Sequence, residues 1–156
     1  SVITLYAKDV LNQQSTGLGL IMLVIGIAMI FSQLFLVEKM SKFFGELQTF
    51  NLGQLLMGLG IILMYIKPDL ILFTTLLLIS TVGFTLSLPT YKSMLTQSAG
   101  DNEQGRVTGI DESIWAAANG IGPLIAGALY SEITFKAFIF FGLILAIPYL
   151  IFGGKD

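Results

Sequence analysis

Five long stretches without a charged side chain constrain this chain more than any other feature. They cover residues 10–37, 47–66, 70–91, 113–131 and 137–154. An α-helix needs about 20 apolar residues to cross the ~30 Å hydrocarbon core of a bilayer, and each stretch is close to that length. A core helix of a water-soluble protein is shorter and keeps a polar face. The sequence therefore predicts an all-α, polytopic transmembrane bundle of about five spans rather than a soluble helical bundle.

The composition excludes several other classes of protein. Only 12% of the residues are charged, whereas a water-facing domain usually has about 25%. The alternation of a transmembrane β-barrel strand is missing, for example at 70–73. A net charge of −2 gives no reason to expect a nucleic-acid partner. With no histidine, no cysteine and no nucleotide-binding glycine loop, the sequence predicts no enzyme, no metal site and no cofactor.

The spans are predicted from the charged and turn-forming residues that interrupt the apolar sequence. Their expected bounds are 16–37, 48–66, 70–91, 102–130 and 135–153. A charged loop is expected at 38–46, and Pro68 should end the second span because proline cannot continue a preceding helix. Asp101 and Gln104 have capping-box spacing, which predicts the start of the fourth helix at about 102. Residues 131–134 are expected to turn the chain.

The basic residues predict an orientation. Five lie on one set of connecting segments and three on the opposite set; the sets are Lys39, Lys42, Lys92, Arg106 and Lys155 against Lys8, Lys67 and Lys136. Cytoplasmic loops carry the excess of lysine and arginine. We therefore expect a multi-pass protein of the cell membrane with its C-terminus in the cytoplasm.

Polar side chains inside the fourth span are the candidates for function. Asp111, Trp115 and Asn119 recur every four residues and share one helix face, and Glu112 adjoins them. A carboxylate at a helix centre costs about 2.5–3.5 kcal/mol on insertion scales, so a lipid-facing position is not expected. One interpretation is a cavity wall with an acid that attracts cations or takes up a proton. The alternative places both acids at the cytoplasmic rim, near the helix N-terminus and paired with a loop lysine or arginine.

Other polar and small residues allow two interpretations each. Gln33, near the inner end of the first span, fits an interhelical hydrogen bond or a place on a pathway. Gly120 and Gly122 belong to small-xxx-small series that let helices approach closely. Pro123 removes a backbone hydrogen bond and predicts a kink, and Gly127 completes this set of kink and packing residues. Such a helix suits a moving, cavity-lining element and equally a static, packed one.

The fourth span also carries a family resemblance. Residues 105–109, GRVTG, followed by 121–130, IGPLIAGALY, resemble the eleventh helix of major facilitator superfamily transporters, most closely of the drug/proton antiporters. Residues 31–40 and 44–46 resemble the end of the eighth helix and the charged loop after it. The likeness covers nearly the whole chain in order and spacing, and nothing in it is specific to one substrate.

The resemblance implies a fold of twelve helices in two halves, with a pathway between the halves. The five spans would be helices eight to twelve, and residues 1–8 would be the outer end of helix seven. The N-terminal half would then lie outside this sequence and act as a partner. The first, third and fourth spans would line the pathway, and the second and fifth would face lipid. Residues 83–89 resemble the inner part of helix ten, but they lack the acid and base that certain drug pumps carry there.

The resemblance also implies a function. We expect the C-terminal portion of a proton-coupled secondary transporter that exports small amphipathic drugs by alternating access, with the lipid bilayer and protons as further partners. Phe84, Trp115 and Asn119 would form an apolar wall, while Asp111 or Glu112 attracts cations or gates the inner mouth. Two alternatives stay open: a transporter of a sugar or other metabolite, and a helical membrane scaffold or assembly subunit that transports nothing.

Overall fold

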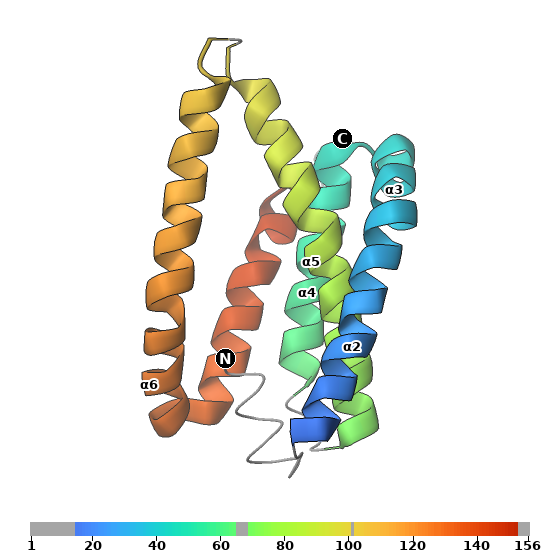
Figure 1. The fold of residues 1–156 in the computed structure, drawn as a ribbon, viewed down its shortest axis with the longest axis vertical. Helices are drawn as coiled ribbons and strands as arrows, with labels where there is room; N and C mark the ends of the chain where they lie inside the picture. Colours follow the sequence, from blue (N-terminus) through green and yellow to red (C-terminus); the bar gives the residue numbers. More distant parts are fainter. Residues whose placement is uncertain (1–14, 65–68, 101, 153–156) are drawn as a thin grey trace.

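The computed structural model describes residues 15–64, 69–100 and 102–152 as helices joined by short turns. The elements are α2 (Ser15–Phe31), the π-helix η1 (Ser32–Leu36), α3 (Val37–Phe44), α4 (Glu46–Leu63), α5 (Leu70–Ser98) and α6 (Gln104–Phe152). Figure 1 shows α2 to α5 side by side as one bundle, with the start of α6 standing apart from it. The described residues contain no strand, which confirms the all-α prediction.

The first helix continues through a segment where the sequence predicts a loop. The elements α2, η1 and α3 follow one another without a break as far as Phe44. The prediction of a charged loop at 38–46 is therefore wrong. Glu38 and Lys42 form an i,i+4 ion pair that favours helix there. The chain reverses only at Gly45, whose φ of 82° lies in the left-handed region that glycine adopts without strain.

The helix α5 also extends beyond its predicted bound of residue 91. It begins at an N-cap, where a carboxylate oxygen of Asp69 accepts hydrogen bonds from the backbone N–H groups of Ile71 and Leu72, both at 3.0 Å. It then passes through Pro89 and ends at Ser98. A proline removes one backbone donor, but the helix on either side of it continues.

The helix α6 doubles back on itself. Residues 131–134, where the sequence predicts a turn, lie within this one helical element, although the path of the chain reverses inside it (Figure 1). Trp115 and Leu145 nevertheless line the same cavity, although a straight helix would separate them by about 45 Å at ~1.5 Å per residue. Figure 1 shows the reversal in the dark orange part of the ribbon. We call the part with Trp115 the first limb and the part with Leu145 the second limb.

Many large apolar side chains lie on the outside of the described residues, although a small apolar cluster that includes Met64 and Phe73 is buried. Large apolar side chains such as Phe43, Ile71 and Leu124 are 82%, 78% and 74% exposed. The buried polar side chains are Ser32, Thr49, Asn51, Ser80, Thr85, Ser87 and Thr90. An apolar exterior and small or polar helix contacts are typical of a bundle in lipid. Among the residues searched, two helices of 29 residues, Thr16–Phe44 and Leu70–Ser98, are long and apolar enough to cross a membrane.

The closest packing in the bundle is between α4 and α5. A methyl group added at Gly83 would lie 2.5 Å from the carbonyl oxygen of Gly53 and 2.7 Å from the backbone nitrogen of Met57. The hydroxyl of Ser87 donates to the carbonyl oxygen of Gly83 on its own helix at 2.9 Å and lies 3.4 Å from the carbonyl oxygen of Phe50 across the same contact. This pair of helices forms one wall of the candidate site.

Candidate functional site

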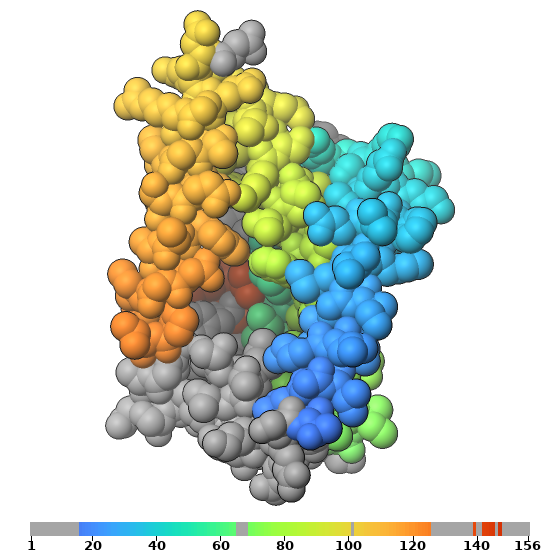
Figure 2. Space-filling model, viewed as in Figure 1, coloured from blue at the N-terminus to red at the C-terminus, as the bar shows by residue number. Residues whose placement is uncertain are grey.

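A cavity of about 340 Å³ lies between α4, α5 and the two limbs of α6. Its lining residues come from all four helical segments: Phe50, Gln54 and Met57 of α4, Phe84, Ser87, Leu88, Tyr91 and Lys92 of α5, Asp111 and Trp115 of the first limb, and Leu145 of the second limb. Figure 2 shows this side of the molecule hollowed between the orange first limb and the yellow-green α5, with parts of α4 and the second limb at the back of the hollow.

Four aromatic side chains, Phe50, Phe84, Tyr91 and Trp115, line the cavity. Phe84 of α5 and Trp115 of the first limb stack with ring centroids 6.5 Å apart and an angle of 27° between the planes. Phe50 and Tyr91 lie 6.4 Å apart at 35°. Helix spacing explains the α5 contribution, because Phe84, Leu88 and Tyr91 recur on one face at i, i+4 and i+7.

Two polar contacts close the cavity at the end near the α5–α6 turn. The hydroxyl of Tyr91 donates a hydrogen bond of 2.8 Å to a carboxylate oxygen of Asp111. One residue further along each helix, Lys92 forms an ion pair with Glu112. The carboxylates of Asp111 and Glu112 and the ammonium group of Lys92 therefore meet at this end of the cavity, which is its polar end within the described residues.

The structure thus brings three of the predicted site residues together. Phe84, Trp115 and Asp111 line the cavity, and Glu112 lies beside it through Lys92. Both acids pair with α5, a helix partner, and not with a loop residue. Asp111 lies on the cavity wall and Glu112 is part of the closing contact, while the attraction of a cation or uptake of a proton by either acid stays a prediction.

Asn119 and Gln33 lie away from this group. The amide of Asn119 is exposed and donates to the carbonyl oxygen of Trp115 on its own helix, at 2.8 Å. Gln33 is exposed on η1 and is not among the residues that line the cavity. A role for either side chain on a pathway stays a prediction.

The predicted kink and packing residues face open space where they are described. A methyl group at Gly120 or Gly122 would meet no atom within 4 Å. Pro123 lies within α6, which continues on both sides of it. The surroundings of Gly127 lie outside the described part of the structure. Close helix approach along this face therefore stays a prediction.

The contributions of α4 and of the closing contact were not predicted from the sequence. The second and fifth spans were expected to face lipid, yet Phe50, Gln54 and Leu145 line the cavity, and none of the described residues that line it belongs to α2. The adjacent polar pairs Tyr91-Lys92 and Asp111-Glu112 could have indicated the closing contact. One pair precedes and the other follows one short connection, and neighbouring antiparallel helices place such pairs at the same height.

The comparisons with known proteins agree with this architecture. The family model described as Major Facilitator Superfamily matches residues 1–154. The chain belongs to the major facilitator superfamily. Its members are membrane transporters and not enzymes, so this chain is part of a membrane protein of a transporter family.

Two curated relatives illustrate which proteins of the superfamily this chain is similar to. The tetracycline resistance protein, class C, of Escherichia coli is 27% identical over 128 residues, which is 81% of this chain and 32% of that protein. The quinolone resistance protein NorA of Staphylococcus aureus (strain Mu50 / ATCC 700699) is 29% identical over 130 residues, again 81% and 32%. The chain thus spans about a third of the length of these relatives. No solved structure matches it.

Proposed function

We propose that this chain is the C-terminal portion of a proton-coupled transporter that exports small amphipathic drugs across the cell membrane by alternating access. The observation that carries the proposal is the aromatic cavity with one acidic end. Apolar and aromatic lining binds a ligand mainly by buried area, and a few polar groups orient it. A cavity of about 340 Å³ suits a small drug-sized molecule.

The geometry supports a different role for each part of the cavity in this half of the transporter. Phe84 and Trp115 provide an aromatic surface from two different helices, so a ligand that lies against both rings would contact both α5 and the first limb. Asp111 would attract a positively charged group at the closed end. Opening requires that the contacts of Tyr91 with Asp111 and of Lys92 with Glu112 break, which would separate the first limb from α5.

Alternating access requires a second half, and the chain supplies only about a third of the length of its relatives. The proposal therefore includes an N-terminal half that completes the pathway, movement of the two halves around a site near the membrane midplane, and a C-terminus on the cytoplasmic side. The excess of basic residues on the 38–46 and 92–106 side supports that orientation.

The test is transport by the full-length protein in proteoliposomes with an imposed proton gradient. Trp115→Ala should lower the export of a fluorescent amphipathic probe about tenfold, because it removes one face of the aromatic wall. Ile114→Ala is the matched control, since Ile114 is the preceding residue, is 65% exposed and does not line the cavity. Equal loss in both variants would contradict the proposed site.

The same assay separates the alternative functions. A sugar or metabolite site needs several convergent amides or hydroxyls, and the cavity offers Gln54 and Ser87 besides its closed end. Flux of a sugar without flux of the amphipathic probe would replace the drug proposal. Absence of any gradient-driven flux in a well-folded preparation would favour a scaffold.

A further inference from the structure

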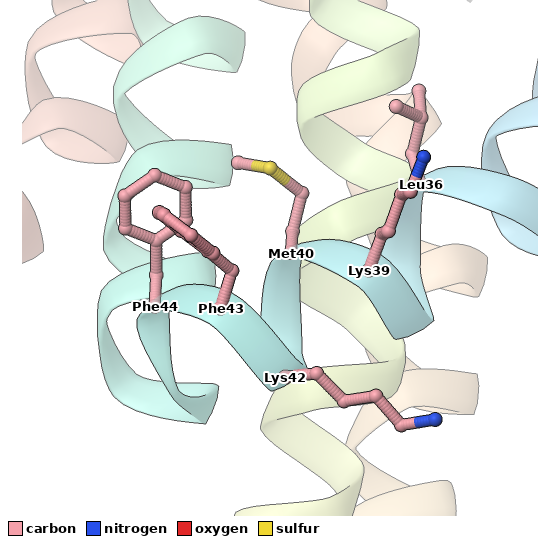
Figure 3. Close-up of a pocket in the computed structure, with 6 residues that line it drawn as sticks. All are labelled: Leu36, Lys39, Met40, Lys42, Phe43 and Phe44. Atoms are coloured by element: carbon pink, nitrogen blue, oxygen red, sulfur yellow. The ribbon is translucent and has the colours of Figure 1, made fainter.

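Two hollows of the molecule differ in where their polar side chains come from. One, of about 480 Å³, is lined by a single continuous helix, and Figure 3 shows its six side chains with the two lysines directed away from each other: Leu36, Lys39, Met40, Lys42, Phe43 and Phe44. The aromatic cavity, in contrast, receives polar side chains from α4, α5 and the first limb of α6. Polar groups that converge from several elements fix the orientation of a ligand, so the aromatic cavity is the place to look for selectivity.

The polar side chains that line the aromatic cavity are Gln54, Ser87, Tyr91, Lys92 and Asp111. All of them except Gln54 already have a partner in the protein. The hydroxyl of Ser87 donates to the carbonyl oxygen of Gly83 at 2.9 Å, and the other three side chains belong to the two contacts that close the cavity. The side chain of Gln54 forms no hydrogen bond with any residue that the structure describes. Within the described lining, its amide is therefore the group that is left to pair with a ligand.

The contact between α4 and α5 fixes the height of Gln54 in the cavity. Gly53, the preceding residue, meets α5 between Gly83 and Ser87. A methyl group added there would lie 2.6 Å from the carbonyl oxygen of Gly83 and 2.3 Å from the hydroxyl oxygen of Ser87. Phe84 lies within the same interval of α5, so Gln54 shares the level of the aromatic stack between α5 and the first limb.

The polar end of the cavity lies one helical turn away from Gln54. Phe50 precedes Gln54 by four residues on the same face of α4, which corresponds to about 6 Å at ~1.5 Å per residue. The ring of Phe50 lies 6.4 Å from the ring of Tyr91, whose hydroxyl donates to Asp111. The cavity therefore has two places for polar groups of a ligand: the amide of Gln54 among the aromatic rings, and the closed end one turn from it.

The amide of Gln54 needs another partner when a ligand separates it from water. It has two N–H donors and one carbonyl acceptor. A ligand that fills the cavity displaces water from this half-buried side chain, and an apolar ligand leaves the amide unpaired, which weakens binding. A carboxamide in the ligand offers both an acceptor and a donor to the amide of Gln54. Such a site rejects the analogue that lacks the hydrogen-bonding group.

We propose that Gln54 is a specificity-determining residue of the aromatic cavity and selects amphipathic ligands that carry a carboxamide in their aromatic part. The rings of the ligand lie against Phe84 and Trp115, the carboxamide pairs with the amide of Gln54, and the cationic group lies one turn away near Asp111. This inference rests on the proposed substrate site, and it narrows the substrate class from amphipathic molecules in general.

The experiment compares two fluorescent ligands of nearly equal shape. One is a naphthalene carboxamide with a dimethylaminopropyl tail. The other is its trans-alkene isostere, which keeps the ring and the cation but has no hydrogen-bonding group between them. Their dissociation constants are measured with the full-length protein in nanodiscs, and partition into empty nanodiscs is subtracted. Gln54→Met, which is similar in length, should weaken binding of the carboxamide about tenfold and leave binding of the alkene unchanged or slightly tighter.

A neighbouring variant controls for the substitution itself. Leu55→Met introduces the same residue at the next position of α4, which does not line the cavity, and should leave both dissociation constants unchanged. Equal weakening of both ligands by Gln54→Met, or unchanged binding of the carboxamide, overturns the proposal. Wild-type protein gives a test that needs no variant, because it should bind the carboxamide more tightly than the alkene. Equal affinities in wild type overturn the proposal as well.

Export from proteoliposomes separates this proposal from the proposed function. Trp115→Ala should weaken the binding and export of both ligands, because both depend on the aromatic wall. Selective loss of carboxamide binding in Gln54→Met, without export of either ligand by wild type, would uphold the role of Gln54 and contradict the proposed transport. Export of both ligands by wild type, with no effect of Gln54→Met on either, would uphold the transport and overturn the role of Gln54.

Discussion

The two flanks of α5 are built in different ways. Toward α4, backbone meets backbone, and Gly83 has no room for a methyl group against Gly53. Toward the first limb of α6, only the ends of side chains meet, through the stack of Phe84 on Trp115 and the contacts of Tyr91-Lys92. Small residues on the first limb, such as Gly120, face open space.

This difference shows which parts of the chain can move relative to each other. Van der Waals contact between close helices provides much of the association energy in a membrane, and it holds α4 and α5 together as one unit. The first limb of α6 depends on a few partly exposed polar contacts, which are individually weak. Movement that opens the cavity is therefore expected between α5 and the first limb, and not between α4 and α5.

Crosslinking tests this comparison with the largest expected effect. Cysteine replacements of Tyr91 and Asp111, joined by a short thiol crosslinker, should abolish transport by the full-length protein because they prevent the first limb from separating. The matched pair replaces Glu46 and Ser93, whose side chains hydrogen-bond at 2.6 Å between α4 and α5. Crosslinking that pair should leave most of the activity.

The background for this experiment must be free of other cysteines, and this chain contributes none. Activity is measured before crosslinking, after it and after cleavage of the crosslink. Recovery upon cleavage separates a block of movement from misfolding. Comparable inhibition by both crosslinks would show that the two flanks of α5 are equally mobile.

A methyl group added at the α4–α5 contact should lower the stability of the protein, whereas one added to the first limb of α6 should not. Gly83→Ala places a methyl group 2.5 Å from the carbonyl oxygen of Gly53, so the helices must separate, and we expect a loss of about 1–3 kcal/mol or more in the free energy of unfolding. Gly120→Ala meets no atom within 4 Å and should be neutral or slightly stabilising. Thermal melting of the full-length protein in detergent compares them, and similar melting temperatures would contradict the tight contact.

The same comparison explains what could be predicted from the sequence. Membrane-spanning helices follow from charge-free length, because burying charge in lipid is costly wherever the helix lies. The i+4 spacing of Asp111 and Trp115 places them on one face of the helix, and both line the cavity in the structure, while their role in transport stays a prediction. These are properties of single segments.

Properties of pairs of segments could not be read in this way. The α4–α5 contact needs Gly53 and Gly83 at the same height, and the sequence of either helix leaves that register open. The predicted helix ends at residues 37 and 91 were wrong for a related reason, since helix continues to Phe44 and to Ser98. Charge and proline mark the end of an apolar stretch, whereas helix ends depend on whether a backbone reversal, here at Gly45, is available.

The buried amide of Asn51, on α4, provides a test with a smaller expected effect. Asn51 is 1% exposed, and neither its amide nitrogen nor its oxygen has a hydrogen-bond partner among the residues that the structure describes. Leaving a buried polar group unpaired costs about 1–3 kcal/mol. Asn51→Leu, close in size, should therefore raise the free energy of unfolding by about 1–2 kcal/mol.

Thr49→Val is the matched control for this test, because the Thr49 hydroxyl is also buried but donates to the carbonyl oxygen of Gly45 at 2.7 Å. Removing a satisfied group should destabilise the protein slightly. Destabilisation by Asn51→Leu as well would show that the amide is paired in the full-length protein, which would place a polar partner against α4.

The smallest expected effect concerns the ion pair between α5 and the first limb of α6. The side chains of Lys92 and Glu112 are 40% and 51% exposed, so a double-mutant cycle with Lys92→Met and Glu112→Gln should give a coupling energy of only about 0.2–1 kcal/mol. A weak pair is what a separable contact requires, since it must break in every transport cycle. A coupling energy of several kcal/mol would mean that the first limb is held as firmly as α4, and the proposed movement would then have to occur elsewhere.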